Sequence, residues 1–345
     1  MQTRAKVLTA GVAALAGGAA GVSRLRALDR RLRADILADP VGELLEAPLE
    51  GGRPLPVASS DGTRIHAQLF GPDDAPTVVL GHGWMEGTRF FTHQIRELSR
   101  DHRVVAWDLR GHGRSGDPTG GDYSIEAIAA DLDAVLEAAL PAGERAVVAG
   151  HSLGGMAIVA WAGINPDAVR KRVGAAALLN TGVHGLIADS LVIRSPAALE
   201  WTRDAIGRTI LAAPGRLPSR SSPVSYEVVR YLALGPDAGP ATVAFCEELL
   251  LSCGPEARAG CGATLAELHL VESIASLDVP TLVVAGERDR LTPPVHSRRL
   301  VDALPQGEYL ELERIAHMSP VEAPDEIARR LRALARDQLA PVAAR

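Results

Sequence analysis

Short apolar runs alternate with segments of helical spacing from about residue 54 onward. The runs that predict strands are Leu55–Val57, Arg64–Phe70, Thr77–Leu80, His102–Asp108, Arg145–Ala149, Ala175–Leu179, Thr281–Ala285 and Tyr309–Leu312. The predicted helices are Phe90–Leu98, Ser124–Leu140, Met156–Ile164, Val295–Leu304 and Pro324–Leu339. The first two strands flank a turn and predict an antiparallel hairpin. The later alternation is typical of crossover units, so we expect an α/β fold with a mostly parallel eight-stranded sheet and helices on both faces.

The stretch from Val183 to Leu277 interrupts this alternation. It contains short amphipathic segments separated by prolines and glycines, and it holds no convincing strand. We interpret it as a helical cap inserted between two core strands. The predicted organisation is therefore an N-terminal segment (1–53), a first core part (54–182), the cap (183–277) and a second core part (278–345).

The N-terminus raises the question of targeting. Arg4 and Lys6 precede an uncharged stretch, Val7–Ser23, which resembles a signal peptide or a short membrane anchor. The stretch is rich in Ala and Gly, is short for a span and has cationic flanks on both sides, so a loosely packed helix is an equal alternative. Membrane attachment or export and a cytoplasmic location both stay open, and the sequence does not determine the oligomeric state.

Composition narrows the classes of partner. The formal net charge is −6, and only two of the basic residues are lysines, Lys6 and Lys171. This balance argues against a nucleic-acid-binding protein, which usually carries a basic patch. We expect a small-molecule partner instead.

Three cysteines, Cys246, Cys253 and Cys261, lie close together in the sequence. They form no Cys-x-x-Cys pair and have no histidine at ligand spacing, so a zinc site is not expected. Cys253 and Cys261 could form a disulfide in an exported protein. Free, partly buried thiols are the favoured alternative.

The candidate nucleophile is Ser152. The pattern Gly150-x-Ser152-x-Gly154 directly follows a predicted strand and opens a predicted helix, as in a nucleophile elbow. Small neighbours leave room for a sharp turn, and the N-terminus of the following helix favours a developing negative charge. A structural Gly-rich turn is the weaker alternative.

A serine hydroxyl needs a base and a group that orients the base. His317 follows the last predicted strand, and Asp289 follows the strand Thr281–Ala285, so both should reach the same sheet edge as Ser152. Glu287 competes with Asp289, but it lies closer to the strand end and suits a structural hydrogen bond better.

An oxyanion hole requires two N–H donors. We expect the backbone N–H of Leu153, next to the nucleophile, and that of Trp84, in the loop after the strand Thr77–Leu80. His82 in the same loop, and Asp108 with His112 in the loop after the fourth strand, are expected to order these loops.

Five motifs in this order resemble the α/β-hydrolase superfamily, in its esterase, lipase and peroxidase-like branch with a helical cap. They are Gly81-His82-Gly83-Trp84, Asp108 to Ser115, Gly150 to Gly155, Gly286-Glu287-Arg288-Asp289 and Ala316-His317. The resemblance covers about residues 54–340. The serine at the elbow differs from the aspartate that the dehalogenase and epoxide-hydrolase branches use there.

The sequence thus predicts a serine hydrolase that cleaves a carboxylic ester or similar acyl substrate through an acyl-enzyme on Ser152. No cofactor and no metal are expected. The nearest alternative is a cofactor-free peroxidase-like or carbon–carbon-bond hydrolase with the same triad. A non-catalytic ligand-binding protein and a membrane-associated interaction protein are alternatives of other classes. Acyl-chain length and leaving group are not encoded in these motifs.

Overall fold

The computed structural model describes residues 19–192, 200–213, 215, 217–218 and 220–339. Most of the uncharged N-terminal stretch, residues 7–18, lies outside these ranges. Within them, no helix combines the length and the apolar composition that crossing a bilayer requires. The predicted membrane association of the N-terminus therefore stays a prediction.

The core is an eight-stranded sheet in the order β1-β2-β4-β3-β5-β6-β7-β8. Its strands are β1 (Arg53–Ala58), β2 (Arg64–Phe70), β3 (Thr77–Gly81), β4 (Arg103–Trp107), β5 (Ala146–His151), β6 (Val173–Leu179), β7 (Thr281–Gly286) and β8 (Gly307–Leu312). The β1–β2 and β2–β4 pairs are antiparallel, and all other pairs are parallel. The predicted fold class is confirmed, and each predicted strand matches to within about two residues at either end.

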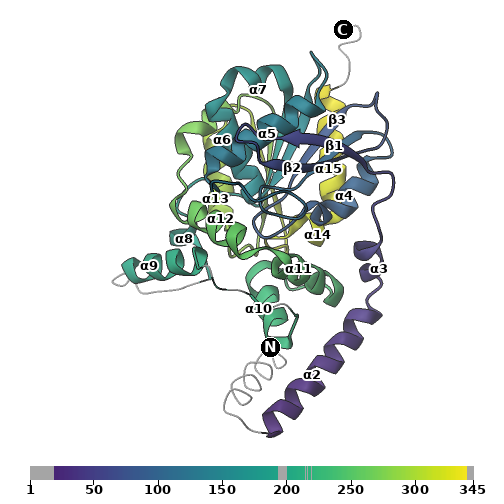
Figure 1. Ribbon diagram of the computed structural model, residues 1–345, viewed down its shortest axis with the longest axis vertical. Helices are drawn as coiled ribbons and strands as arrows, with labels where there is room; N and C mark the ends of the chain where they lie inside the picture. Colours follow the sequence, from purple (N-terminus) through teal and green to yellow (C-terminus); the bar gives the residue numbers. More distant parts are fainter. Residues whose placement is uncertain (1–18, 193–199, 214, 216, 219, 340–345) are drawn as a thin grey trace.

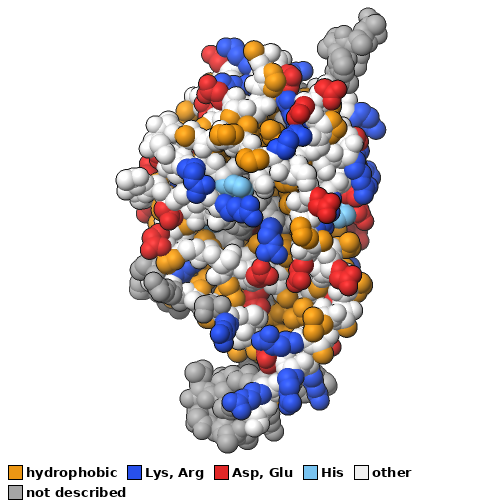
Figure 2. Space-filling model, turned by 45° about the vertical axis from the view of Figure 1, so that its right-hand side comes forward, with side chains coloured by type: hydrophobic (Ala, Val, Ile, Leu, Met, Phe, Trp, Pro, Cys, Tyr) orange, Lys and Arg blue, Asp and Glu red, His pale blue; other side chains and the backbone are white. Residues whose placement is uncertain are grey.

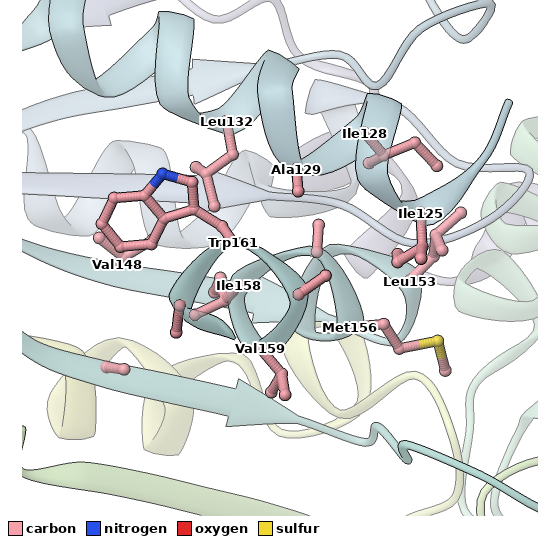
Figure 3. Packing of buried hydrophobic residues seen from close by; sticks show 14 of the residues in the cluster. Ile125, Ile128, Ala129, Leu132, Val148, Leu153, Met156, Ile158, Val159 and Trp161 are labelled. Atoms are coloured by element: carbon pink, nitrogen blue, oxygen red, sulfur yellow. The ribbon is translucent and has the colours of Figure 1, made fainter. Parts of the chain in front are cut away.

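Helices cover both faces of the sheet because consecutive strand residues point to opposite sides. Val148 of β5 belongs to the apolar cluster that contains α5 (Ile125–Ala139) and α6 (Leu153–Ile164). Its neighbour Val147 belongs to the cluster on the other face, with α4 (Thr92–Leu98) and α15 (Pro324–Leu339). Figure 1 shows these two layers, and Figure 3 shows how the side chains of α5 and α6 interdigitate.

The chain leaves the sheet after β6 and returns at β7, and the segment 183–277 between them is helical. It contains α8 (Leu186–Asp189), α9 (Glu200–Leu211), α10 (Pro223–Ala233), α11 (Pro240–Ser252), α12 (Pro255–Glu267) and η3 (Val271–Ser276). Three of these helices begin at a proline, whose fixed φ suits the first helical turn. Among the described residues of this segment, the only β-type pairing is an isolated bridge between His184 and His269. The helices α8 to α12 lie together at one end of the sheet (Figure 1).

Shorter elements complete the core, and one long helix projects from it. The remaining elements are α2 (Ala19–Ala38), α3 (Val41–Glu46), η1 (Thr88–Phe91), α7 (Pro166–Arg172), α13 (Pro294–Ala303) and α14 (Ser319–Glu322). Figure 2 shows basic side chains at the end of the molecule where α2 lies. Four arginines of α2 are exposed, namely Arg26, Arg30, Arg31 and Arg33.

All three cysteines carry free thiols, so Cys253 and Cys261 do not form a disulfide. Cys246 and Cys261 are buried. Burial raises the pKa of the Cys253 thiol to about 12, which leaves this group protonated and unreactive at neutral pH.

Candidate active site

Ser152 lies at the turn from β5 into α6 and adopts a left-handed backbone conformation, with φ 48° and ψ −113°. This geometry depends on the two flanking glycines. A Cβ on Gly150 would lie 2.4 Å from the carbonyl carbon of Gly154, and a Cβ on Gly154 would lie 2.3 Å from the carbonyl oxygen of Gly81. Because both obstacles are backbone atoms, no side-chain rotation could relieve the overlap.

Substitution Gly154→Ala is therefore expected to destabilise the protein by about 3 kcal/mol or more, as overpacking against backbone does. Thermal unfolding followed by circular dichroism would measure the loss. Gly120→Ala is the matched control, because a Cβ at Gly120 meets no atom within 4 Å. Equal melting temperatures for both variants would contradict this account of the elbow.

The structure brings His317 and Asp289 together at the same sheet edge. The loop after β7 carries Asp289 and the loop after β8 carries His317, and Nδ1 of His317 lies 2.8 Å from Oδ2 of Asp289. Burial alone would lower the pKa of His317, but the charge and hydrogen bond of Asp289 outweigh it and raise the pKa. This pairing places the Nδ1 proton toward the carboxylate and leaves Nε2 as the basic nitrogen.

Two further side chains hold the Asp289 carboxylate in place. Oδ2 accepts hydrogen bonds from Thr292 Oγ1 at 2.9 Å and from Asn180 Nδ2 at 3.1 Å. Oδ1 accepts the backbone N–H groups of Leu291 and Thr292, each at 2.9 Å. Burial alone would raise the pKa of Asp289, yet His317 and these donors hold it below its usual value. Asp289 is thus ionised and fixed in orientation.

The sequence reasoning did not find Asn180 or Thr292. Thr292 had a local signal, since a side chain and N–H three residues after an aspartate often close a turn on its carboxylate. Asn180, at the end of β6, is separated from Asp289 by more than a hundred residues and had no such signal.

Glu287, the alternative to Asp289 as the acid that orients His317, makes different contacts. Its Oε2 accepts the backbone N–H of Arg314 at 2.9 Å, and its Oε1 lies 3.3 Å from Arg288. Of the two acidic residues after β7, only Asp289 contacts His317 among the described residues.

Ser152 and His317 are both almost fully shielded from solvent. Ser152 is 9% exposed and His317 is 4% exposed. The hydrogen bonds of the His317 ring all involve Nδ1, so none joins Nε2 to Ser152 Oγ in the described chain. Such contacts are often long in a free enzyme and tighten when substrate binds.

The loop after β3 leaves one N–H unengaged. Gly83 N–H donates to Glu86 Oε2 at 2.6 Å, and Met85 N–H donates to His112 Nε2 at 3.1 Å. Trp84 N–H, between them, makes no hydrogen bond among the described residues. Leu153 N–H opens α6 and also has no intrahelical acceptor. Both predicted donors are thus free to bind an anionic oxygen.

Two buried histidines order this loop. His82 donates from Nδ1 to Gly83 O at 2.8 Å and accepts Leu109 N–H on Nε2 at 3.0 Å. His112 donates from Nδ1 to Arg110 O at 2.9 Å, and burial lowers its pKa to about 4.

Asp108 also orders the loops near the site by accepting backbone N–H groups. Its carboxylate accepts the backbone N–H of Thr88 at 2.7 Å and that of Arg114 at 2.9 Å. Asp108, His82 and His112 therefore contact loop backbone rather than the reacting groups.

A buried charged pair lies beneath the elbow and was not expected from the sequence. His151 donates from Nδ1 to Glu86 Oε2 at 3.0 Å, and its Nε2 lies 2.8 Å from the carbonyl oxygen of His317. A carbonyl can only accept, so Nε2 carries a proton. Burial alone would raise the pKa of Glu86, but His151 and the hydrogen bond from the Gly83 N–H lower it. The buried contact between Glu86 and His151 thus connects the loop after β3, the elbow and the His317 loop.

Removing the carboxylate of Glu86 should destabilise the fold, because His151 would stay buried without its partner. Glu86→Gln is expected to lower the free energy of unfolding by about 3–5 kcal/mol, the usual effect of breaking a buried pair. Urea denaturation at pH 7 would measure it. Glu248→Gln is the control, because Glu248 forms an exposed pair with Arg89 and should change stability by only about 0–1 kcal/mol. A loss no larger than that of the control would show that the buried contact between Glu86 and His151 does not stabilise the fold.

No cluster of three or more histidine, cysteine, aspartate or glutamate side chains in the described residues has the arrangement of a metal site.

The model of the family described as "alpha/beta hydrolase fold" matches residues 76–324. Lipase 1 of Psychrobacter immobilis is 26% identical over 279 residues, which cover 79% of this chain and 80% of the lipase. The non-heme chloroperoxidase of Streptomyces lividans is 40% identical over 119 residues, which cover 34% of this chain and 42% of that protein. The crystal structure of the enol-lactonase from Burkholderia xenovorans LB400 superposes with a TM-score of 0.64 at 25% identity, and covers 81% of this chain and 99% of the lactonase.

Proposed function

The chain belongs to the alpha/beta hydrolase fold family, and we propose that it is a serine hydrolase cleaving carboxylic esters or similar small acyl substrates. The relatives support hydrolase activity as a class. The observation that carries the finer proposal is the His317–Asp289 hydrogen bond at the sheet edge where Ser152 is held in a strained turn. This is the arrangement of residue types that activates a serine hydroxyl.

The proposed reaction has two steps. His317 Nε2 takes the proton of Ser152 as Oγ bonds to the substrate carbonyl carbon, and the tetrahedral oxygen accepts the N–H groups of Trp84 and Leu153. When the bond to the leaving alcohol breaks, His317 returns the proton to that alcohol. Water, deprotonated by His317, then attacks the acyl-enzyme, and His317 returns the proton to Ser152 Oγ as the acid is released. Asp289 stabilises the imidazolium in both steps.

We also propose that the segment 183–277 is a cap that controls access and acyl specificity. Two contacts support this role. The Trp84 side chain donates from Nε1 to Arg258 O of α12 at 3.1 Å, and His317 N–H donates to Ala233 O at the end of α10 at 3.0 Å. The segment thus contacts both the loop after β3, which carries Trp84, and the loop after β8, which carries His317. We call the second of these the base loop. Since Ser152 is nearly covered, a substrate needs some displacement of these contacts to enter.

The proposed function is tested with p-nitrophenyl esters from acetate to palmitate and with a fluorophosphonate probe. We expect hydrolysis of at least one chain length and covalent labelling of Ser152. Labelling also separates the enzyme from a non-catalytic binding protein of the same fold. Absence of both hydrolysis and labelling in the folded, full-length chain would refute the proposal.

A peroxidase-like activity is the second candidate, because the chloroperoxidase matches this chain at 40% identity over 119 residues. Hydrogen peroxide in place of water would attack the same acyl-enzyme and release a peracid. Halogenation of monochlorodimedone in the presence of acetate, bromide and hydrogen peroxide would detect it. Ester hydrolysis without halogenation would exclude this second function.

A further inference from the structure

Glu322 accepts three backbone hydrogen bonds, and two of them come from the residues on either side of His317. Oε1 of Glu322 lies 3.1 Å from the N–H nitrogens of both Ala316 and Met318. Glu322 is the last residue of α14, a short helix just after the base loop. One carboxylate oxygen therefore holds the peptide groups that flank the proposed base.

The third hydrogen bond reaches the proposed cap. Oε2 of Glu322 accepts the N–H of Gly235 at 2.6 Å. A Cβ on Gly235 would lie 2.8 Å from this oxygen and 2.2 Å from the carbonyl oxygen of Arg314, so only glycine allows the approach. Arg314 also forms an exposed ion pair with Asp237. The base loop and the chain after α10 thus meet at Glu322.

We propose that Glu322 is a positioning residue that sets the orientation of His317 toward Ser152 and couples it to docking of the 183–277 segment. The proposal rests on the proposed function of the triad. A carboxylate suits this role because it has only acceptors, while all three partners are donors. A glutamine would present an NH₂ group to at least one of these N–H groups and could not accept all three bonds.

The surroundings of Glu322 make the hydrogen bonds that it accepts depend on pH. Burial raises its pKa to about 7, although the three N–H groups oppose the shift, and the charge of Asp289 raises it further. The other titratable groups that it faces among the described residues are His317 on the base loop and Cys246 on α11. Above pH 7 the ionised carboxylate accepts all three bonds, whereas below pH 7 a proton occupies one oxygen and a bond is lost.

The pH profile of kcat/KM for a p-nitrophenyl ester tests this role. His317 and Glu322 must both be unprotonated, so log kcat/KM of the wild-type enzyme should fall below pH 7 with a slope approaching two. Glu322→Gln should show a slope of one, and at pH 8 its kcat/KM should be lower by on the order of 100-fold, as for a base displaced by about 1 Å. A merely structural residue would change the amount of folded protein and leave the slope unchanged.

Glu326→Gln is the matched control, because Glu326 on α15 forms partly exposed pairs with Arg329 and Arg330. It should keep the wild-type slope and rate. A slope of one in the pH profile of the wild-type enzyme would overturn the proposal. This measurement needs no variant, so it applies even if the Glu322→Gln protein does not fold. If the wild-type enzyme is labelled by fluorophosphonate but its slope is one, only the role of Glu322 fails. If Ser152 is not labelled, the proposed function fails, and the role of Glu322 with it.

Discussion

Ser152→Ala is expected to reduce kcat for p-nitrophenyl ester hydrolysis by about 10⁶-fold. This magnitude is the loss found when the nucleophile of a serine hydrolase is removed. Without Oγ, no acyl-enzyme can form, and only the much slower direct attack of water on the bound ester remains. Initial rates with saturating ester and the absence of fluorophosphonate labelling would measure the effect.

The Ser152→Ala protein should remain folded, because alanine lacks only the Oγ atom of serine and leaves the backbone of the turn unchanged. Its melting temperature should stay close to that of the wild-type protein. Ser252→Ala is the matched control, since Ser252 is exposed and, among the described residues, its hydroxyl donates only to the Leu249 carbonyl of its own helix. Near wild-type turnover by the Ser152→Ala protein would refute the proposed mechanism.

Asp289→Asn is expected to lower kcat by about 10⁴-fold, the cost of holding the base in the wrong tautomer. An asparagine that keeps its Oδ1 bonds to Thr292 and Leu291 would turn its NH₂ group toward His317. Nδ1 of His317 would then have to accept, and its proton would move to Nε2, where the serine proton must go. The effect should appear in kcat more than in KM, because substrate contacts are not removed.

Glu287→Gln provides the comparison for this prediction. Glu287 follows the same strand, but its carboxylate binds the N–H of Arg314 and does not contact His317. We expect this variant to retain activity within a few-fold of wild type. If Glu287→Gln were the damaging change and Asp289→Asn were tolerated, the assignment of the acid would be wrong.

The comparison of sequence and structure is clearest at the elbow. Its turn depends on neighbours in the chain, so the glycines two residues before and after Ser152, together with a predicted strand before them and a predicted helix after them, predicted it. The sheet was predictable for a similar reason. Buried strands need apolar runs, and a strand buried on both faces shows little alternation, as in β5 and β6.

The partners of the triad illustrate what local pattern cannot supply. Asn180 and Asp289 meet because β6 and β7 are neighbours in the sheet, although the 183–277 segment separates them in the chain. The Glu86–His151 pair forms between the loop after β3 and the last residue of β5. No periodicity or short motif encodes such a contact.

The sequence by itself determined the order of strands and helices, the position of Ser152 on a strained turn, and the sheet edge to which His317 and Asp289 belong. These features follow from residue spacing along the chain and from the rule that the ends of parallel strands meet. Tertiary structure alone decided that Asn180 holds the Asp289 carboxylate, and how Glu322 connects the base loop to Gly235. The reason is physical: a buried hydrogen-bonding group must find its partner in space, and the folded backbone, not sequence distance, sets which partner lies within reach.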